Sequence, residues 1–180
     1  LATSLVADLQ LIAATIVWTI SEHGTGAGLT PMVMSSIVSL SGGALPLADG
    51  ILLGMAKFNR VLEIDYANRC AVVQPGVTNL AITKAVEHKG FYYAPDPSSQ
   101  IACTIGGNVA ENSGGVHCLK YGLTANNVLG IEMVLVTGEV IRLGGKHLDA
   151  EGFDLLGIMT GSEGLLGVVT EVTVRILQKP

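Results

Sequence analysis

One segment of the sequence, residues 95–115, concentrates residue types that bind ligands rather than catalyse reactions. Its neutral hydrogen-bonding side chains belong to Ser98, Ser99, Thr104, Asn108 and Asn112. Its glycine pairs, Gly106-Gly107 and Gly114-Gly115, let backbone N–H groups approach an anion such as pyrophosphate, and the polar side chains suit ribityl and ribose hydroxyls. Long non-periodic segments in compact domains are usually functional. The segment therefore predicts a nucleotide-cofactor site, and a surface loop with structural glycines is the alternative.

A second glycine-rich turn, Gly161-Ser162-Glu163-Gly164, precedes a run of alternating apolar and polar residues at 167–177. Such alternation is typical of a strand with one buried face. A turn that feeds a strand brings its backbone N–H groups close to whatever the first segment binds. We expect the two segments to hold the same ligand.

The sequence does not contain complete versions of other common cofactor-binding and metal-binding motifs. The turn at 24–28 has two of the three glycines of a Rossmann pattern, but Leu29 stands where the third is needed. Gly144-Gly145-Lys146 lacks the first glycine and the hydroxyl of a phosphate-binding loop. His117 and Cys118 are adjacent and His147 is distant, so no metal site is predicted.

The composition narrows the class of protein. Of the 180 residues, 49% are hydrophobic and only 14% are charged, a balance that excludes a largely disordered chain. The net charge of −5 argues against nucleic-acid binding. Three cysteines without a C-x-x-C pair fit a reducing compartment, and the longest apolar stretch, 11–20, is too short to span a bilayer. We expect a cytoplasmic domain, and the first residue, Leu1, suggests a fragment.

The residue patterns predict an α+β fold with more strand than helix. Strands are expected at 51–55, 61–65, 70–74, 131–136, 140–143 and 167–177, and helices at 78–89 and 153–159. The stretch 5–20 reads as a short helix that runs into a strand, whereas 98–121 shows no periodic element. Thr78 is the expected cap of the helix at 78–89, and Gly90 its left-handed end.

From residue 39 onward the chain resembles the FAD-binding domain of the vanillyl-alcohol-oxidase type flavoproteins, the PCMH-type domain. The resemblance rests on Leu40-Ser41-Gly42-Gly43, Pro95-Asp96-Pro97-Ser98-Ser99, Ile105-Gly106-Gly107-Asn108, Gly114-Gly115-Val116-His117, Lys120-Tyr121-Gly122 and Gly161-Ser162-Glu163-Gly164. Within the superfamily the chain is most similar to the FAD subunits of glycolate oxidases and their D-lactate and D-2-hydroxyglutarate dehydrogenase relatives. An extra segment, about 30–39, separates the two halves of the family's first phosphate loop, so pyrophosphate binding by that loop is in question.

The resemblance implies two α+β subdomains with FAD between them: an incomplete first subdomain at about 1–57 and a second at about 58–180. Together with the residue patterns it assigns the FAD contacts to Gly42, Gly43, Pro95, Asp96, Ser99, Thr104, Gly106, Gly107, Asn108, Asn112, Gly115, Glu163, Gly164 and Val168. No residue is assigned to catalysis, because the family's substrate-binding and metal-binding residues lie in a C-terminal cap domain that these 180 residues do not contain.

The resemblance also implies an FAD-dependent oxidation of a small 2-hydroxy acid, of glycolate or D-lactate type, by hydride transfer to the flavin. The expected partners are the 2-hydroxy acid, bound through the cap domain, and an iron–sulfur or other electron-transfer subunit. Such a partner would place the protein in the cytoplasm or peripherally at the inner membrane. The 180 residues alone are expected to be inactive. The alternatives are a non-catalytic nucleotide-binding remnant and the FAD domain of an enzyme of the alkylglycerone-phosphate-synthase type.

Overall fold

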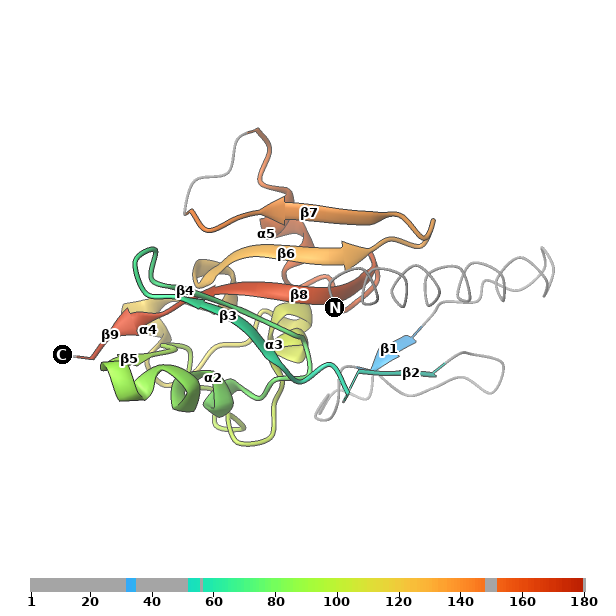
Figure 1. Cartoon of the computed structure of the whole chain (residues 1–180). Coiled ribbons are helices and arrows are strands. Elements are labelled where there is room, and N and C mark those ends of the chain that lie inside the picture. Colours follow the sequence, from blue (N-terminus) through green and yellow to red (C-terminus); the bar gives the residue numbers. More distant parts are fainter. Residues whose placement is uncertain (1–31, 35–51, 56, 148–151, 180) are drawn as a thin grey trace.

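The computed structural model describes residues 32–34, 52–55, 57–147 and 152–179. Its main element is a five-stranded antiparallel sheet in the order β3–β4–β8–β6–β7 (Figure 1). These strands are β3 (Val61–Asp65), β4 (Cys70–Val73), β6 (Val128–Val134), β7 (Val140–Gly144) and β8 (Val168–Arg175). Two small sheets accompany it: a parallel pair, β1 (Met32–Met34) and β2 (Leu52–Gly54), and an antiparallel pair, β5 (Phe91–Tyr92) and β9 (Leu177–Gln178).

Four α-helices are described: α2 (Asn79–Val86), α3 (Ile105–Glu111), α4 (Cys118–Tyr121) and α5 (Leu155–Met159). Helix α2 begins where the sequence predicts, because the Thr78 hydroxyl oxygen accepts the N–H of Ala81 at 3.3 Å. A 3₁₀ turn, Glu87–Lys89, extends α2 to Gly90, which adopts the left-handed conformation with φ 75°. The predicted helix at 78–89 and its two ends are thus confirmed.

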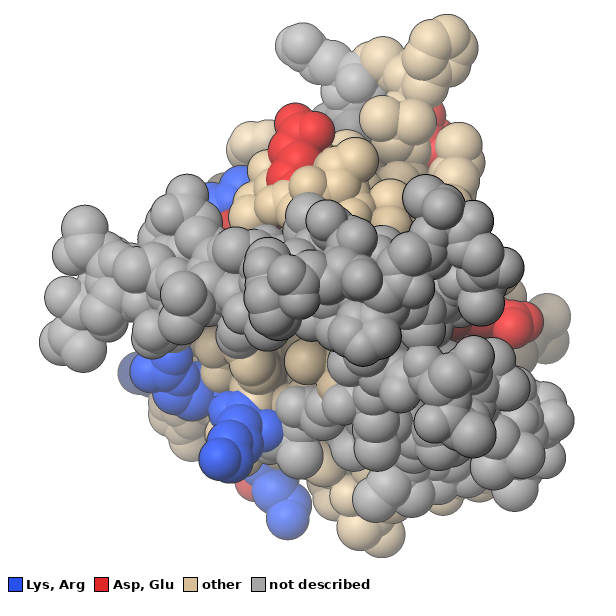
Figure 2. Space-filling view, turned by 90° about the vertical axis from the view of Figure 1, so that its right-hand side faces the viewer, with Lys and Arg blue, Asp and Glu red and all other residues tan. Residues whose placement is uncertain are grey.

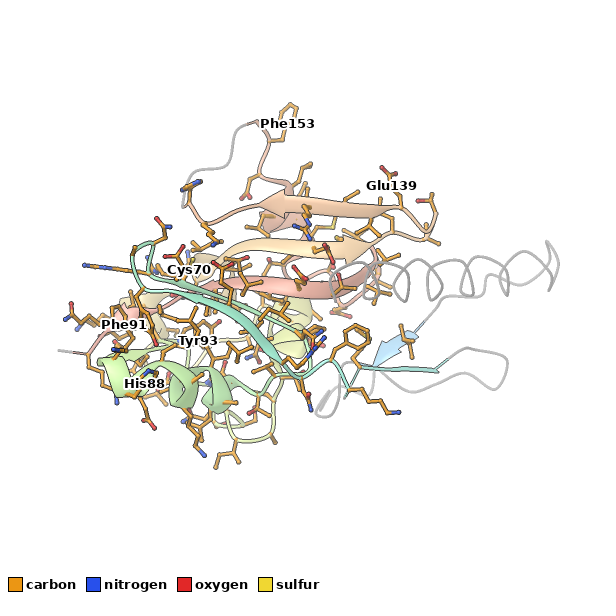
Figure 3. All side chains as sticks on the ribbon, viewed as in Figure 1. Cys70, His88, Phe91, Tyr93, Glu139 and Phe153 are labelled. Atoms are coloured by element: carbon orange, nitrogen blue, oxygen red, sulfur yellow. The ribbon has the colours of Figure 1, made fainter. Side chains whose placement is uncertain are left out.

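The core lies between the sheet and helices α2 and α3. Alternate residues of β8 point into it, and Val172 and Val174 are fully buried, as are Ile82 of α2 and Ile105 of α3. Strand β6 is buried along its whole length. Tyr93 lies between the sheet and α2 (Figure 3) and is 3% exposed. The alternation at 167–177 therefore predicted both the strand and its buried face correctly.

Most of the other sequence expectations for the described residues are also confirmed. Strands occur within 51–55, 61–65 and 70–74, β6 and β7 form the predicted hairpin, and α5 lies within 153–159. The expectation that 98–121 holds no periodic element was wrong, since this stretch contains α3 and α4. The expected elements at 5–20 and the glycine turn at 24–28 lie outside the described residues, as do Gly42 and Gly43.

No helix in the described ranges is long and apolar enough to cross a bilayer. Nor does the described part bring together three His, Cys, Asp or Glu side chains that could hold a metal. The three cysteines are free, with Cys70 and Cys103 buried and Cys118 exposed. Seen from the β1–β2 end, most of the visible Lys and Arg side chains lie together at the lower left, and further basic atoms lie apart from them at the upper left (Figure 2).

Candidate cofactor-binding site

Helix α3 forms the centre of the candidate site. The hydroxyl oxygen of Thr104, which is 3% exposed, caps its first turn by accepting the N–H of Gly107 at 3.3 Å. Ile105 and Val109, one turn apart, are buried in the core. Two adjacent glycines lower helix propensity, which is why the sequence did not indicate this helix. Packing of its apolar face stabilises it in the folded protein.

Gly106 faces the loop that follows β4. A Cβ atom at this position would lie 2.6 Å from the Cβ of Pro75 and 3.1 Å from its carbonyl oxygen. The N–H of Gly106 donates to that same carbonyl at 2.8 Å, and the N–H of Ile105 donates to the carbonyl of Val77 at 2.8 Å. The N–H groups of the first turn of α3 are thus bonded within the protein. The N–H groups of Gly106 and Gly107 thus already have acceptors, and contact between these two residues and the cofactor stays a prediction.

Asn108 belongs to a buried amide network. Its side chain, 1% exposed, donates to the side-chain oxygen of Asn79 at 2.9 Å, and the Asn79 amide donates to the carbonyl of Pro95 at 2.6 Å. Nearly all buried polar groups have such partners, because an unpaired one is costly. Asn79 therefore links Asn108 to Pro95, and this network anchors the start of the 95–99 segment to α2 and α3.

The two loops that carry Asp96 and Gly115 lie directly against each other. The Asp96 carboxylate accepts the backbone N–H of His117 at 3.2 Å through Oδ1 and pairs with the His117 Nδ1 at 2.5 Å through Oδ2. A Cβ atom on Gly115 would overlap the carbonyl group of Asp96. Only glycine allows the two backbones to come this close.

The glycine-rich turn at 161–164 packs on the C-terminal end of α3. The N–H of Gly161 donates to the carbonyl of Val109 at 2.7 Å, and the N–H of Glu163 donates to that of Ala110 at 2.9 Å. Gly161, Glu163 and Gly164 all have positive φ angles, of 90°, 54° and 76°. The two segments that the sequence singled out are therefore adjacent, on either side of one helix.

Several backbone N–H groups around α3 have no acceptor among the described residues. They belong to Ser98, Ser99, Gly114, Gly115, Val116 and Gly164. The segment 114–116 alone presents three of them in succession. Ser98 and Val116 are exposed and the other four residues are partly exposed, so this backbone is accessible to a ligand, and consecutive N–H groups in loops commonly form anion-binding sites.

The remaining predicted contacts lie at the C-terminal end of α3 and at the start of β8. Asn112 has a left-handed backbone, with φ 49°, and its side-chain oxygen accepts the N–H of Ala125 at 2.9 Å. Glu163 is exposed, and Val168, 9% exposed, is the first residue of β8. These positions border the 161–164 turn, so all the described predicted residues gather around α3.

A pocket of about 380 Å³ opens beside the Asp96–His117 pair. Its lining includes Tyr92, Tyr121 and Lys179, none of which the sequence assigned to a site. The rings of Tyr92 and Tyr121 meet edge to face at 6.1 Å. Burial, followed by the hydrogen bond with Tyr121, raises the pKa of Tyr92 to about 12, so Tyr92 is a neutral phenol at neutral pH. The Lys120-Tyr121-Gly122 motif was the one signal that could have pointed to this pocket.

Comparison with known proteins identifies the family. The FAD binding domain family matches residues 20–144. The glycolate oxidase subunit GlcD of Escherichia coli K12 is 64% identical over 141 residues, which are 78% of this chain and 28% of that protein. A D-lactate dehydrogenase of Archaeoglobus fulgidus is 43% identical over 138 residues, 76% of this chain and 31% of that enzyme. The chain thus spans about 30% of the length of these relatives.

A solved structure shows the same architecture. An alkyldihydroxyacetonephosphate synthase superposes with a TM-score of 0.73 at 26% sequence identity, covering 83% of this chain and 27% of that one. The mixed arrangement of helices and sheet is that of the PCMH-type fold. The chain belongs to the FAD-binding domain family of the PCMH-type flavoproteins.

Proposed function

We propose that this chain binds FAD around α3 and forms the cofactor-binding part of an oxidoreductase that acts on a small 2-hydroxy acid. The observation that carries the proposal is the gathering, at 98–99, 114–116 and Gly164, of backbone N–H groups that have no acceptor within the described ranges. The donor set fits FAD, because N–H groups suit the pyrophosphate and the flavin carbonyl oxygens, and the Ser99 hydroxyl suits the ribityl chain. Family membership supports the same cofactor.

The chain's own residues would hold the cofactor mainly through the backbone. The N–H groups at 114–116 and those of Ser98 and Ser99 would bind its polar groups from one side, and the 161–164 turn with Val168 from the other. Thr104, Gly106 and Asn108 would act indirectly, because their polar groups or packing fix α3. Bound FAD would supply the ring system that accepts a hydride. The protein would supply position and electrostatics.

The substrate class rests on the relatives. Glycolate and D-lactate are both small 2-hydroxy acids, and the relatives named for them are 64% and 43% identical to this chain. The alkyldihydroxyacetonephosphate synthase supports a second candidate reaction, but its identity is only 26%. The higher identities favour oxidation of a 2-hydroxy acid.

We further propose that the electrons leave through a partner subunit, in the cytoplasm or at the inner membrane, because the Escherichia coli relative is itself described as a subunit. A boundary between two subdomains near residue 57 is supported by the topology. The parallel pair β1–β2 precedes this residue, whereas every strand of the five-stranded sheet follows it.

The purified protein is expected to take up FAD with quenched flavin fluorescence and not to bind NAD. Titration of the protein with each cofactor, followed by fluorescence, measures this directly. Riboflavin, which lacks the pyrophosphate and adenosine, is the matched control and should bind at least about tenfold more weakly, since several hydrogen bonds to charged groups are lost. The FAD should be released on denaturation. Tight NAD binding without FAD uptake would overturn the assignment.

The FAD-loaded protein expressed from the complete gene is expected to lose its flavin absorbance when mixed anaerobically with glycolate or D-lactate. The same 180 residues alone should stay oxidised, because a carboxylate substrate needs a bound cation and the loops around α3 offer only His117 and Lys120. No bleaching of the complete protein by either acid would refute the substrate class. Rapid bleaching of the 180 residues would place the catalytic groups within them.

A further inference from the structure

We propose that Asp96 is a positioning residue of the FAD site rather than a ligand of the cofactor. Its carboxylate fixes the 114–118 segment against the 95–99 segment, and this contact holds the N–H groups of Gly114, Gly115 and Val116 in place. The inference rests on the proposed FAD binding and assigns Asp96 a role different from the direct contact that the sequence predicted.

Both carboxylate oxygens of Asp96 are occupied by the protein. Oδ1 accepts the backbone N–H of His117 at 3.2 Å, and Oδ2 lies 2.5 Å from the Nδ1 of the same residue. The Asp96 side chain is 22% exposed, whereas that of His117 is 63% exposed. One carboxylate therefore holds one residue by both its backbone and its side chain, and 21 residues of chain separate the two.

Charge argues against direct contact between Asp96 and the pyrophosphate of FAD. Two negative charges in contact repel each other, and they do so more strongly near a protein surface than in water. Paired with His117, the carboxylate is turned to the neighbouring loop. Asp96 then acts on the cofactor only through the N–H groups that it positions.

The geometry on both sides of Asp96 shows why its position is well defined. The preceding carbonyl, that of Pro95, is held by the buried Asn79 amide at 2.6 Å. On the other side, the bare Cα of Gly115 packs against the Asp96 carbonyl group, where any Cβ would overlap it. Asp96 thus links the buried amide network to the exposed loop.

The contact also sets the start of α4. The N–H of Cys118 donates to the carbonyl of Gly115 at 3.1 Å, and the N–H of Tyr121 donates to that of His117 at 3.0 Å. The ring of His117 lies 6.4 Å from that of Tyr121, beside the pocket. Loss of the Asp96 contact would therefore disturb the loop, α4 and the Tyr121 wall of the pocket together.

The test compares Asp96→Ala with Asp96→Asn, by hydrogen exchange of the protein without FAD and by FAD titration. Asparagine keeps an acceptor for the His117 N–H and an amide that can face the Nδ1, whereas alanine keeps neither. A hydrogen bond to a charged group contributes about 1.5–3 kcal/mol, so Asp96→Ala should speed exchange of the hydrogen-bonded amides of this segment about tenfold or more, namely those of His117, Cys118, Lys120 and Tyr121. FAD affinity should fall by a similar factor in Asp96→Ala and stay within about threefold in Asp96→Asn.

Glu139→Ala is the matched control, because Glu139 is an exposed carboxylate on the distant β6–β7 turn (Figure 3). Glu139→Ala should change neither the hydrogen exchange of the loop amides nor the FAD affinity. Unchanged loop exchange in Asp96→Ala overturns the positioning role, and so does an equal loss of FAD affinity in both Asp96 variants. Exchange is read without cofactor, so failure of the wild-type protein to bind FAD would count against the proposed function and leave the exchange result to decide the role of Asp96.

Discussion

Replacement of Asn79 by leucine is expected to lower the free energy of unfolding by about 2–5 kcal/mol, because two buried polar groups lose their partner at once. The Asn79 side chain donates to the carbonyl of Pro95 at 2.6 Å and accepts the amide of Asn108 at 2.9 Å. Asn79 is 2% exposed and Asn108 is 1% exposed, so water cannot replace the lost bonds. Urea unfolding followed by circular dichroism measures the change.

Two further variants separate this network from ordinary packing. Lys84→Leu adds the same side chain on the exposed face of the same helix and should change stability by no more than about 0.5 kcal/mol. Combining Asn79→Leu with Asn108→Leu removes the orphaned amide, so the double variant should lose about 1 kcal/mol less than the sum of the two single losses. Additive losses would show that the two amides do not interact energetically.

The parts of the fold that local patterns encode were predictable from the sequence. Residues 168–176 alternate between core and surface, and a strand with one buried face is the conformation that satisfies this pattern. Thr78 and Gly90 mark the two ends of the α2 region by a side-chain cap and a left-handed residue, both of which depend only on local geometry. The sequence predicts these elements because the interactions that form them involve residues only a few positions apart in the chain.

Helix α3 could not be predicted in the same way, because its stability comes from distant parts of the chain. Gly106 and Gly107 disfavour a helix locally, by roughly 1 kcal/mol each relative to alanine. The helix forms because Ile105 and Val109 are buried under the sheet and because its first turn bonds to the carbonyls of Pro75 and Val77. Those partners lie about thirty residues earlier in the sequence, and no local sequence pattern indicates these contacts.

In the candidate site, too, some features have local causes in the sequence and others depend on distant contacts. The glycine-rich segments and their resemblance to a family predicted which residues gather around α3. The roles of individual side chains depend on long-range pairs: Asn108 with Asn79, and Asp96 with His117. A polar residue in a glycine-rich loop is interpreted from the sequence as a ligand contact. The structure shows that the Asn108 amide and the Asp96 carboxylate are bonded to other segments, and their contact with the cofactor stays a prediction.

Gly106→Val is expected to destabilise the protein by about 3 kcal/mol, near the upper end of the usual cost of overpacking. The new Cβ would lie 2.6 Å from the Cβ of Pro75 and 3.1 Å from its carbonyl oxygen. Pro75 is buried and its ring is rigid, so α3 itself must move, and with it the hydrogen bond from the Gly106 N–H to the Pro75 carbonyl. The melting temperature should fall by roughly 6–12 °C, which differential scanning calorimetry measures.

Gly107→Val is the matched variant, because it introduces the same β-branched side chain at the neighbouring position of the same helix. Both variants carry the same cost in helix propensity, and Gly107 is partly exposed whereas Gly106 is buried, so the difference between them reports the packing around position 106. We expect Gly107→Val to keep most of its stability and to lose FAD uptake. The main effect of Gly106→Val should instead be a loss of stability. If Gly107→Val proves as unstable as Gly106→Val, the contact with Pro75 is not what requires glycine at position 106. Partial recovery of stability in Gly106→Val combined with Pro75→Gly, relative to Pro75→Gly alone, would confirm that contact directly, since glycine removes the Cβ atom that the new side chain meets at 2.6 Å.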